Sequence, residues 1–201
     1  MNIGVLGGTF DPVHTGHIIV AEEARVKLNL AEVLFVPAGL PWLRGDSPVA
    51  AAEHRVHMVR LAIDGKPYFR LSMIEIERSG HSYTVDTIAE LKGQLGAKDE
   101  LYFILGWDSL VELPRWQEPS RLIAMCRLVA VPRVGCSAPD LDSLETSIPG
   151  VVDRVILLDK PRVDISASGI RERVARGLPI DHLVPEPVER YIREQGLYTT
   201  A

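Results

Sequence analysis

The sequence predicts an α/β fold, in which a doubly wound, mostly parallel sheet carries helices on both faces. Three observations predict it. Short apolar runs bounded by turn residues recur along the chain, as expected for buried parallel strands. Segments with apolar residues every three or four positions alternate with these runs, as crossover helices would. The first run also leads directly into a glycine-rich turn, so a ligand site is expected at the carboxyl ends of the strands.

The order of the elements follows from the same patterns. Apolar runs predict buried parallel strands at 3–6, 33–36, 101–105, 128–131 and 155–158. Helical spacing predicts helices at 18–28, 50–63, 85–95, 141–147 and 170–175. A last helix is expected at 187–195, where Pro187 suits a first turn and Gly196 suits a helix end. The stretch 68–76 is ambiguous, because its apolar residues fall on both faces of any edge strand drawn through it.

Composition limits the class of protein. The chain has 201 residues, of which 46% are hydrophobic and 24% charged, which fits a single domain, 1–201, with 165–201 as a C-terminal helical part. Its formal net charge of −5 argues against a nucleic-acid-binding face and favours small-molecule phosphates as partners. We expect a cytoplasmic monomer or homodimer without a membrane partner, because no leader pattern or long apolar span is present. The two cysteines, Cys126 in an apolar run and Cys136 in a loop, predict no disulfide framework.

The first chemical motif is the segment 7–17, GGTFDPVHTGH, between the first strand and the first helix. Its glycines allow a sharp turn and let a ligand approach the main chain. The helix that follows offers free N–H groups and a positive dipole end to an anion. His14 and His17 lie at this helix entrance, where they can donate to phosphate oxygens. We therefore predict phosphoryl or nucleotidyl transfer, with both histidines catalytic and with Gly8, Thr9 and Phe10 binding the phosphates.

Other interpretations of this motif are weaker. Two histidines can bind a metal, but no nearby Cys, Asp or Glu cluster completes a ligand set. They can also be capping or surface residues, although the flanking glycines argue against this. Neither Gly-Lys-Ser/Thr nor Gly-x-Gly-x-x-Gly is present, so the two commoner phosphate signatures are excluded. The segment instead resembles the signature of the nucleotidylyltransferase superfamily, which implies a Rossmann-like fold and the release of pyrophosphate from a nucleoside triphosphate.

A second motif, ISASGIR at 165–171, opens a predicted helix. Ser166 suits a helix N-cap, Ser168 and the first-turn N–H groups can receive an anion, and Arg171 offers a planar fork for phosphate oxygens. Alone, the segment also fits a capped surface helix with a solvated Arg-Glu-Arg face. It resembles the Ile-Ser-x-Ser/Thr-x-Ile-Arg signature of adenylyltransferases, which implies that Ile165, Ser166, Ser168 and Arg171 bind ATP and that Arg171 is catalytic.

A third motif lies at the end of the apolar run 101–105, where the chain passes through Gly106 to Asp108. A carboxylate just beyond a strand end can accept hydrogen bonds from ribose hydroxyls or an adenine amino group. Gly106 and Asp108 are therefore predicted to bind ATP. Asp108 also suits a helix N-cap, and the two roles are compatible.

The fourth motif combines SGHSYTVDT at 79–87 with LPRW at 113–116. It resembles the bacterial nicotinate-nucleotide adenylyltransferases, and the resemblance extends from the first strand to the last helix. It implies that main-chain N–H groups of Tyr83 and Thr84 bind the pyridine carboxylate and that Trp116 stacks on the ring. A helix N-terminus suits a carboxylate and an indole suits an electron-poor ring. Thr84 as a helix cap and Trp116 as a packing residue are the alternatives.

The chain departs from the family pattern at two places. After the second strand the family often has Pro-Pro-His-Lys, whereas this chain has LPWLR at 40–44. Arg44 can still supply positive charge to the mononucleotide, the role of Trp42 is open, and the loop 38–47 suggests a lid. Trp107 stands between Gly106 and Asp108, where a small residue is usual.

Together the motifs predict transfer of AMP from ATP to nicotinate mononucleotide, giving deamido-NAD and pyrophosphate. Mg²⁺ is the expected cofactor, held mainly by phosphates and water, so no protein metal ligand is predicted. Thr9, Phe10 and Arg44 are expected on the mononucleotide side as well. The alternatives are a dual-specificity enzyme for the acid and amide mononucleotides, an adenylyltransferase for pantetheine phosphate, and a nucleotide-binding regulatory module without turnover.

Overall fold

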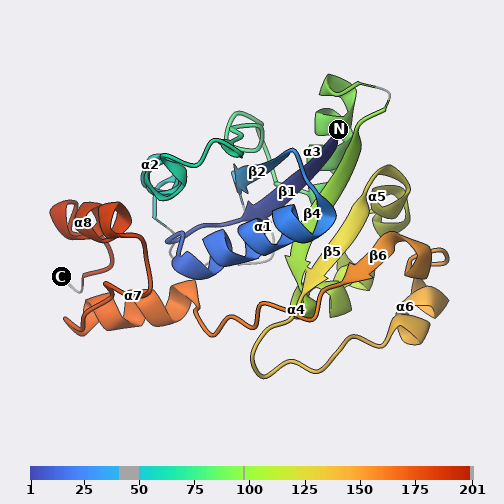
Figure 1. The fold of residues 1–201 in the computed structure, drawn as a ribbon. Coiled ribbons are helices and arrows are strands. Elements are labelled where there is room, and N and C mark those ends of the chain that lie inside the picture. Colours follow the sequence, from blue (N-terminus) through green and yellow to red (C-terminus); the bar gives the residue numbers. More distant parts are fainter. Residues whose placement is uncertain (41–49, 97, 200–201) are drawn as a thin grey trace.

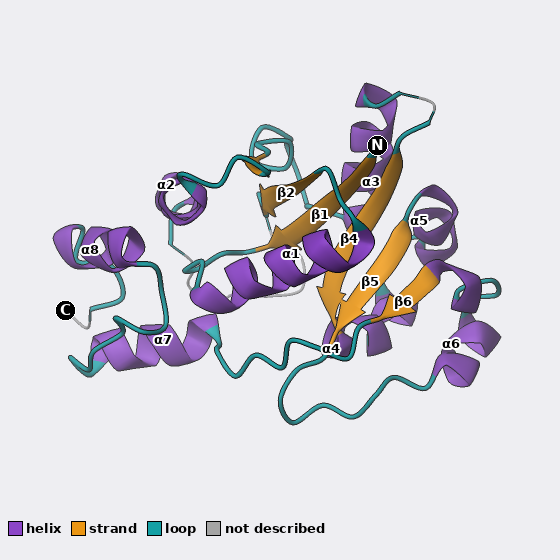
Figure 2. Ribbon diagram, in the orientation of Figure 1, coloured by secondary structure: helices purple, strands orange, loops and turns teal. Residues whose placement is uncertain are grey.

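The computed structural model describes residues 1–40, 50–96 and 98–199, and it contains one six-stranded sheet (Figures 1 and 2). The sheet order is β3-β2-β1-β4-β5-β6, and every neighbouring pair of these strands is parallel. The strands are β1 (Asn2–Gly8), β2 (Glu32–Pro37), β3 (Phe69–Leu71), β4 (Glu100–Gly106), β5 (Arg127–Val131) and β6 (Val155–Leu157). The predicted doubly wound α/β fold is confirmed. The strand order reverses between β1 and β4, so their carboxyl ends are the expected place for a ligand.

The six predicted helices are present, and the structure adds two short ones, α4 and α5. The α-helices are α1 (Thr15–Leu28), α2 (Ala52–Ile63), α3 (Thr84–Gln94), α4 (Trp107–Val111), α5 (Pro119–Met125), α6 (Leu141–Ser147), α7 (Ala167–Ala175) and α8 (Glu186–Glu194). Two short 3-10 turns are η1 (Leu113–Arg115) and η2 (Val152–Arg154). The sequence analysis missed α5, a two-turn helix that starts at Pro119 and buries Leu122 and Ile123. In so short a helix, two buried residues give too little periodicity to predict it.

Two apolar layers sandwich the sheet. On one face α1 and α2 cover the sheet, and Ala21 and Ala24 of α1 are fully buried there, while α7 and α8 extend the same apolar cluster. On the other face α3, α4, α5 and α6 pack through residues such as Ile88 and Leu122. Cys126 lies in this second layer, as predicted, and its burial raises the pKa of the thiol to about 12. Figure 1 shows α7 and α8 set apart from the strands, beside α1 and α2. None of the described helices is long and apolar enough to cross a membrane.

The glycines of the first motif do not make the turn that the sequence predicted. Gly7 and Gly8 continue β1 and pair with β2, opposite Val36 and Pro37. The chain reverses two residues later, where Phe10 has a φ of 51°. Space at Gly8 is limited, because a Cβ there would lie 3.3 Å from the Phe10 ring. The turn therefore belongs to the residues after the glycines, and the close approach of a ligand to this main chain stays a prediction.

Two edge segments differ from the sequence-based expectation. Of the ambiguous stretch 68–76, only Phe69–Leu71 forms a strand, and the chain then turns so that Ile74 enters the core. The last strand, β6, is not buried as predicted, because it forms the other edge of the sheet and leaves Leu157 37% exposed. An edge strand has a neighbour on one side only, and sequence composition did not indicate that position.

Candidate active site

A cleft of about 420 Å³ opens at the carboxyl ends of β1, β4 and β5. It brings together residues from all four sequence motifs, although these motifs are spread over more than 150 positions of the chain. The predicted site residues that line it are Gly8, Thr9, His14, His17, Thr84, Gly106, Asp108, Trp116 and Ile165.

His14 and His17 hold each other in place at the start of α1. The main-chain N–H of His14, the N-cap residue, donates to Nδ1 of His17 at 3.1 Å. The two rings stack with centroids 3.6 Å apart, and the edge of Phe10 meets the His17 ring at 4.9 Å. Because Nδ1 of His17 accepts a hydrogen bond, the neutral ring carries its proton on Nε2. His17 is therefore oriented as a hydrogen-bond donor.

Both histidines are neutral in the absence of ligand. Burial, with a smaller effect from the positive charge of Arg133, lowers the pKa of His14 to about 4. Burial, the neighbouring His14 and Arg133 lower the pKa of His17 well below its ordinary value. A neutral imidazole N–H can still donate to a phosphate oxygen, and an anion in the cleft would favour the protonated form. These rings can thus stabilise negative charge that builds up during a reaction.

Gly16, between the two histidines, lies where a side chain would not fit. A Cβ at this position would lie 2.5 Å from Val163 and 3.0 Å from Nδ1 of His14. No larger residue fits between the histidines unless the segment that carries Val163 moves. The glycine therefore lets a cleft wall approach the start of α1.

The side chain of Phe10 does not face the cleft. It is 2% exposed and packs against His17 and Phe35 in the core. Any contact of Phe10 with a ligand has to come from its main chain. Thr9 lines the cleft, and its carbonyl accepts a 2.9 Å hydrogen bond from Arg55.

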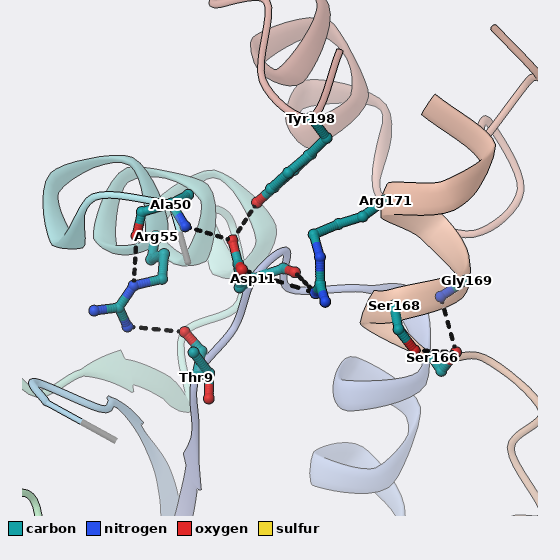
Figure 3. A network of polar contacts seen from close by, with 9 residues as sticks. All are labelled: Thr9, Asp11, Ala50, Arg55, Ser166, Ser168, Gly169, Arg171 and Tyr198. Atoms are coloured by element: carbon teal, nitrogen blue, oxygen red, sulfur yellow. Dashed lines mark hydrogen bonds and ion pairs between the residues drawn. The ribbon is translucent and has the colours of Figure 1, made fainter. Parts of the chain in front are cut away.

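Arg55 on α2 is a buried cation that sequence reasoning missed. It is 2% exposed, and its guanidinium also donates to the carbonyl of Ala38 at 2.7 Å. Figure 3 shows its further bond to the carbonyl of Ala50, at 3.1 Å. A buried arginine with several carbonyl acceptors ties separate backbone segments together. Here it joins the end of β1 to the segment after β2.

The second motif begins α7 beside the cleft. Ser166 is the N-cap, as predicted, and its Oγ accepts from the N–H of Gly169 at 3.1 Å, while the Ser168 hydroxyl donates to it at 3.3 Å. Arg171 is not part of a solvated face, because Nη1 donates to the main-chain oxygen of Asp11 at 2.7 Å. Among the described residues, Ile165 lines the main cleft, whereas Ser166, Ser168 and Arg171 do not.

The third motif places Asp108 in the cleft wall. Gly106 is the N-cap of α4, so Asp108 lies in the first turn and is not the cap itself. A Cβ at Gly106 would lie 2.3 Å from Oδ1 of Asp108, so a side chain there would displace the carboxylate. Oδ2 of Asp108 pairs with Nη1 of Arg133 at 2.8 Å. Trp107 turns into the core, where its indole donates to the carbonyl of Ala130 at 3.3 Å, which accommodates this departure from the family pattern.

Arg133 is a second residue that the sequence analysis did not single out. It follows β5, and it is the one Lys or Arg side chain among the described residues that line the cleft. A lone arginine after a strand forms no recognisable motif in the sequence. Its charge acts on both histidines, as their lowered pKa values indicate.

The fourth motif forms the far end of the cleft. α3 begins at Thr84, and Tyr83 is its N-cap, whose carbonyl accepts from the N–H of Thr87 at 3.2 Å. Trp116 packs edge-on against Phe103 with centroids 6.0 Å apart. Its indole Nε1 is buried and has no hydrogen-bond partner among the residues that the structure describes. Trp116 thus packs on the core, as one interpretation predicts, and it also lines the cleft. Its stacking on a ligand ring stays a prediction.

Glu75 and Ser82 form a polar floor that was also missed. Thr87 donates to Glu75 at 2.6 Å, and the N–H of Gly39 donates to Ser82 at 3.0 Å. Burial raises the pKa of the Glu75 carboxyl. Arg44, Trp42 and most of the expected lid 38–47 lie outside the described residues, so these predictions concern a part of the chain that the structure does not describe.

Comparison with known proteins places these features in a family. The cytidylyltransferase-like family model matches residues 5–173. A probable nicotinate-nucleotide adenylyltransferase of Dehalococcoides mccartyi is 53% identical over 198 residues, which cover 98% of this chain and 97% of that relative. The chain belongs to the nicotinate-nucleotide adenylyltransferase family. A probable member from Roseiflexus sp. (strain RS-1) is 47% identical over 196 residues, covering 98% of this chain and 97% of its own. The resemblance drawn from the sequence motifs is confirmed.

Solved structures of nicotinate-nucleotide adenylyltransferases share the fold. The Plasmodium falciparum nicotinic acid mononucleotide adenylyltransferase, solved in complex with NaAD, aligns with a TM-score of 0.77 and 22% identity, covering 98% of this chain and 97% of that one. A structure from Vibrio parahaemolyticus aligns with a TM-score of 0.71 and 15% identity, covering 100% and 96%. At these identities the likeness concerns the fold.

Proposed function

We propose that this member of the family transfers AMP from ATP to nicotinate mononucleotide, giving deamido-NAD and pyrophosphate in NAD synthesis. One observation carries the proposal. A single cleft joins a phosphate-binding helix entrance, with His14 and His17, to a helix start and an indole at Thr84 and Trp116. The first end suits a triphosphate and the second suits a charged pyridine ring. The relatives that are about half identical carry the corresponding name.

The reaction requires alignment and charge stabilisation more than covalent chemistry. The 5′-phosphate of the mononucleotide is already an anionic nucleophile, so it can attack the α-phosphorus of ATP directly. We assign the main chain at Gly8, Thr9 and Phe10 to the phosphates, with the mononucleotide phosphate also near Thr9 and Phe10. His14 and His17 would donate to the α-phosphate oxygens as negative charge develops.

The pyrophosphate leaving group would lie toward α7. Ser166, Ser168 and the first-turn N–H groups offer donors there, and Arg171 offers a bidentate cation. Ile165 would contact the nucleotide from the cleft side. We add Arg133 to this set, because it is the charged cation of the described cleft lining and its exposed pair with Asp108 is weak enough to rearrange.

The two nucleoside ends would occupy opposite walls. Gly106 and Asp108 would bind the adenosine of ATP, the carboxylate accepting from hydroxyl or amino groups. Main-chain N–H groups of Tyr83 and Thr84 would bind the pyridine carboxylate and Trp116 would stack on the ring. Arg44 remains a proposed contact of the mononucleotide.

Mg²⁺ is the cofactor that we propose. In the described part of the chain no three His, Cys, Asp or Glu side chains come together as a metal-binding group. The cleft therefore fits a hard cation that arrives with the triphosphate and keeps phosphate and water ligands, so we assign it no protein ligand. When bound, the cation would offset negative charge on the pyrophosphate.

The setting of the reaction follows from its substrates. Both are soluble anionic metabolites, and the net charge of −5 supports small molecules over nucleic acid as partners. We propose a cytoplasmic enzyme that works as one domain, 1–201, either as monomer or homodimer.

Identification of the product tests the proposal. The protein is incubated with ATP, Mg²⁺ and nicotinate mononucleotide, and the products are separated and identified by mass spectrometry. Deamido-NAD and pyrophosphate in equal amounts are expected. Binding of ATP without any product would instead indicate a regulatory module that has lost turnover.

A further inference from the structure

Asp11 lies at the centre of a polar network outside the cleft lining (Figure 3). It belongs to the loop between the glycines and the two histidines, and it is 1% exposed. Its Oδ1 accepts from the N–H of Ala50 at 3.2 Å and from the hydroxyl of Tyr198 at 2.7 Å. A carboxylate with so little solvent depends on these donors for its orientation.

Tyr198 reaches this loop from the other end of the chain. After α8 the backbone turns back through Gly196, and the N–H of Leu197 bonds to the carbonyl of Ile192 at 3.0 Å. Tyr198 itself has a φ of 64°, a left-handed conformation that a residue with a side chain rarely adopts. Such an outlier persists where surrounding contacts hold it, and here the contact is Asp11. Burial and the Asp11 carboxylate raise the pKa of the phenol, so it keeps its proton and donates.

Arg171 on α7 also reaches Asp11. Its Nη1 lies 2.7 Å from the main-chain oxygen of Asp11 and 3.7 Å from Oδ2. Oδ2 is buried and has no hydrogen-bond partner among the described residues, so the guanidinium is its neighbouring charge. Figure 3 shows Tyr198 and Arg171 converging on Asp11 from the C-terminal end and from α7. The two oxygens of one carboxylate thus face two different residues.

We propose that Tyr198 is a positioning residue, which fixes the Asp11 carboxylate and through it sets the guanidinium of Arg171 at the phosphate site. The inference rests on the proposed function, in which Arg171 binds the leaving pyrophosphate. Without the hydroxyl, Oδ1 keeps only the Ala50 N–H, and the carboxylate can rotate toward Arg171. Such a rotation pulls the guanidinium away from the triphosphate, and small displacements of this kind lower turnover strongly.

The test compares two matched tyrosines. Tyr198→Phe removes one hydroxyl and leaves the ring to pack. Tyr191→Phe is the control. Tyr191 lies on α8, in the same C-terminal part of the chain, and its hydroxyl bonds to His54 at 2.8 Å and not to the loop that carries Asp11. We expect Tyr198→Phe to lower kcat/KM for ATP about 10-fold and to leave KM for nicotinate mononucleotide within about twofold. Tyr191→Phe should change neither constant by more than about twofold.

A double variant separates positioning from general loosening. If Tyr198 acts through Arg171, adding Tyr198→Phe to Arg171→Ala should lower kcat/KM by less than about twofold further. A full additional 10-fold loss, or equal losses for both substrates together with a lower melting temperature, would overturn the proposal. An active wild type with an unaffected Tyr198→Phe variant would also overturn it, while the proposed reaction would stand. A wild type that forms no deamido-NAD would refute the proposed function itself.

Discussion

The ring of His14 stacks on the ring of His17 at a centroid distance of 3.6 Å, while its main-chain N–H orients the same ring through Nδ1. One residue therefore fixes both the plane and the tautomer of the other. A donor that is oriented before the reaction costs little reorganisation when charge develops.

Removal of His17 should abolish most of the activity. His17→Ala loses a preorganised donor to the reacting phosphate, so kcat should fall by about 10²-fold or more. Steady-state pyrophosphate release measures it. His182→Ala, at an exposed histidine, is the control and should keep the wild-type rate. A His17→Ala variant with a near-normal kcat would remove His17 from the reaction.

The buried histidines should make the fold sensitive to acid. The pKa of His14 is about 4 in the folded protein, below its ordinary value of 6.5, so the unfolded chain takes up the proton first as pH falls. Stability is then lost between these two values, and the loss at pH 5 is about 2 kcal/mol for His14. Urea unfolding at pH 7.5 and at pH 5 measures this loss. The free energy of unfolding should fall less between the two pH values in His14→Gln than in the wild type. Equal pH dependence of both proteins would contradict the assignment.

Trp116 should affect one substrate more than the other. Stacking of an aromatic ligand on an indole contributes about 1–3 kcal/mol, so Trp116→Ala should raise KM for nicotinate mononucleotide about 10-fold or more. KM for ATP should stay within about twofold. Trp107→Phe, whose indole turns into the core, serves as the control. Equal increases in both KM values would show that Trp116 shapes the cleft without binding the ring.

Arg133 should matter for the triphosphate. Loss of one charge-assisted hydrogen bond costs about 1.5–3 kcal/mol, so Arg133→Ala should raise KM for ATP or lower kcat by about 10-fold or more. Arg121→Ala removes an exposed arginine that pairs with Glu118 and should be neutral. The same kinetic assay compares both. An unaffected Arg133→Ala enzyme would mean that the arginine stays paired with Asp108 during the reaction.

Arg55 should support the fold. Its guanidinium serves several carbonyls and is 2% exposed, so Arg55→Ala should lower the free energy of unfolding by about 3 kcal/mol. Lysine lacks the planar fork of arginine, so Arg55→Lys should retain only part of the stability that Arg55→Ala loses. Urea unfolding gives the values, with Arg190→Ala, at an exposed pair with Glu186, as the neutral reference. A change below about 0.5 kcal/mol in Arg55→Ala would contradict this role.

Sequence reasoning predicted the features that local patterns encode. The apolar runs predicted β1, β2, β4, β5 and β6, and the first motif predicted a ligand site at the carboxyl ends of the strands. Ser166 was predicted as an N-cap and acts as one, because capping depends on neighbours three positions away. Periodicity and short-range chemistry are properties of a few consecutive residues.

Long-range contacts were beyond the same reasoning. Tyr198 meets Asp11 across 187 positions, and Arg55 reaches Thr9 across 46. The residues next to Tyr198 and Arg55 in the sequence do not predict these distant partners. The turn at Phe10 was misplaced for a related reason, since Gly7 and Gly8 are small to admit Phe103 and Phe10, and their φ values stay those of a strand.

The choice of acceptor tests the central claim most directly. Pyrophosphate release from ATP with Mg²⁺ is measured in parallel with nicotinate mononucleotide, nicotinamide mononucleotide and phosphopantetheine. The cleft described here predicts the highest kcat/KM for the acid mononucleotide, because a helix N-terminus at Thr84 favours a carboxylate over a neutral amide. Equal use of acid and amide would contradict that carboxylate site, and activity with phosphopantetheine alone would contradict the assignment of the ring-binding end of the cleft.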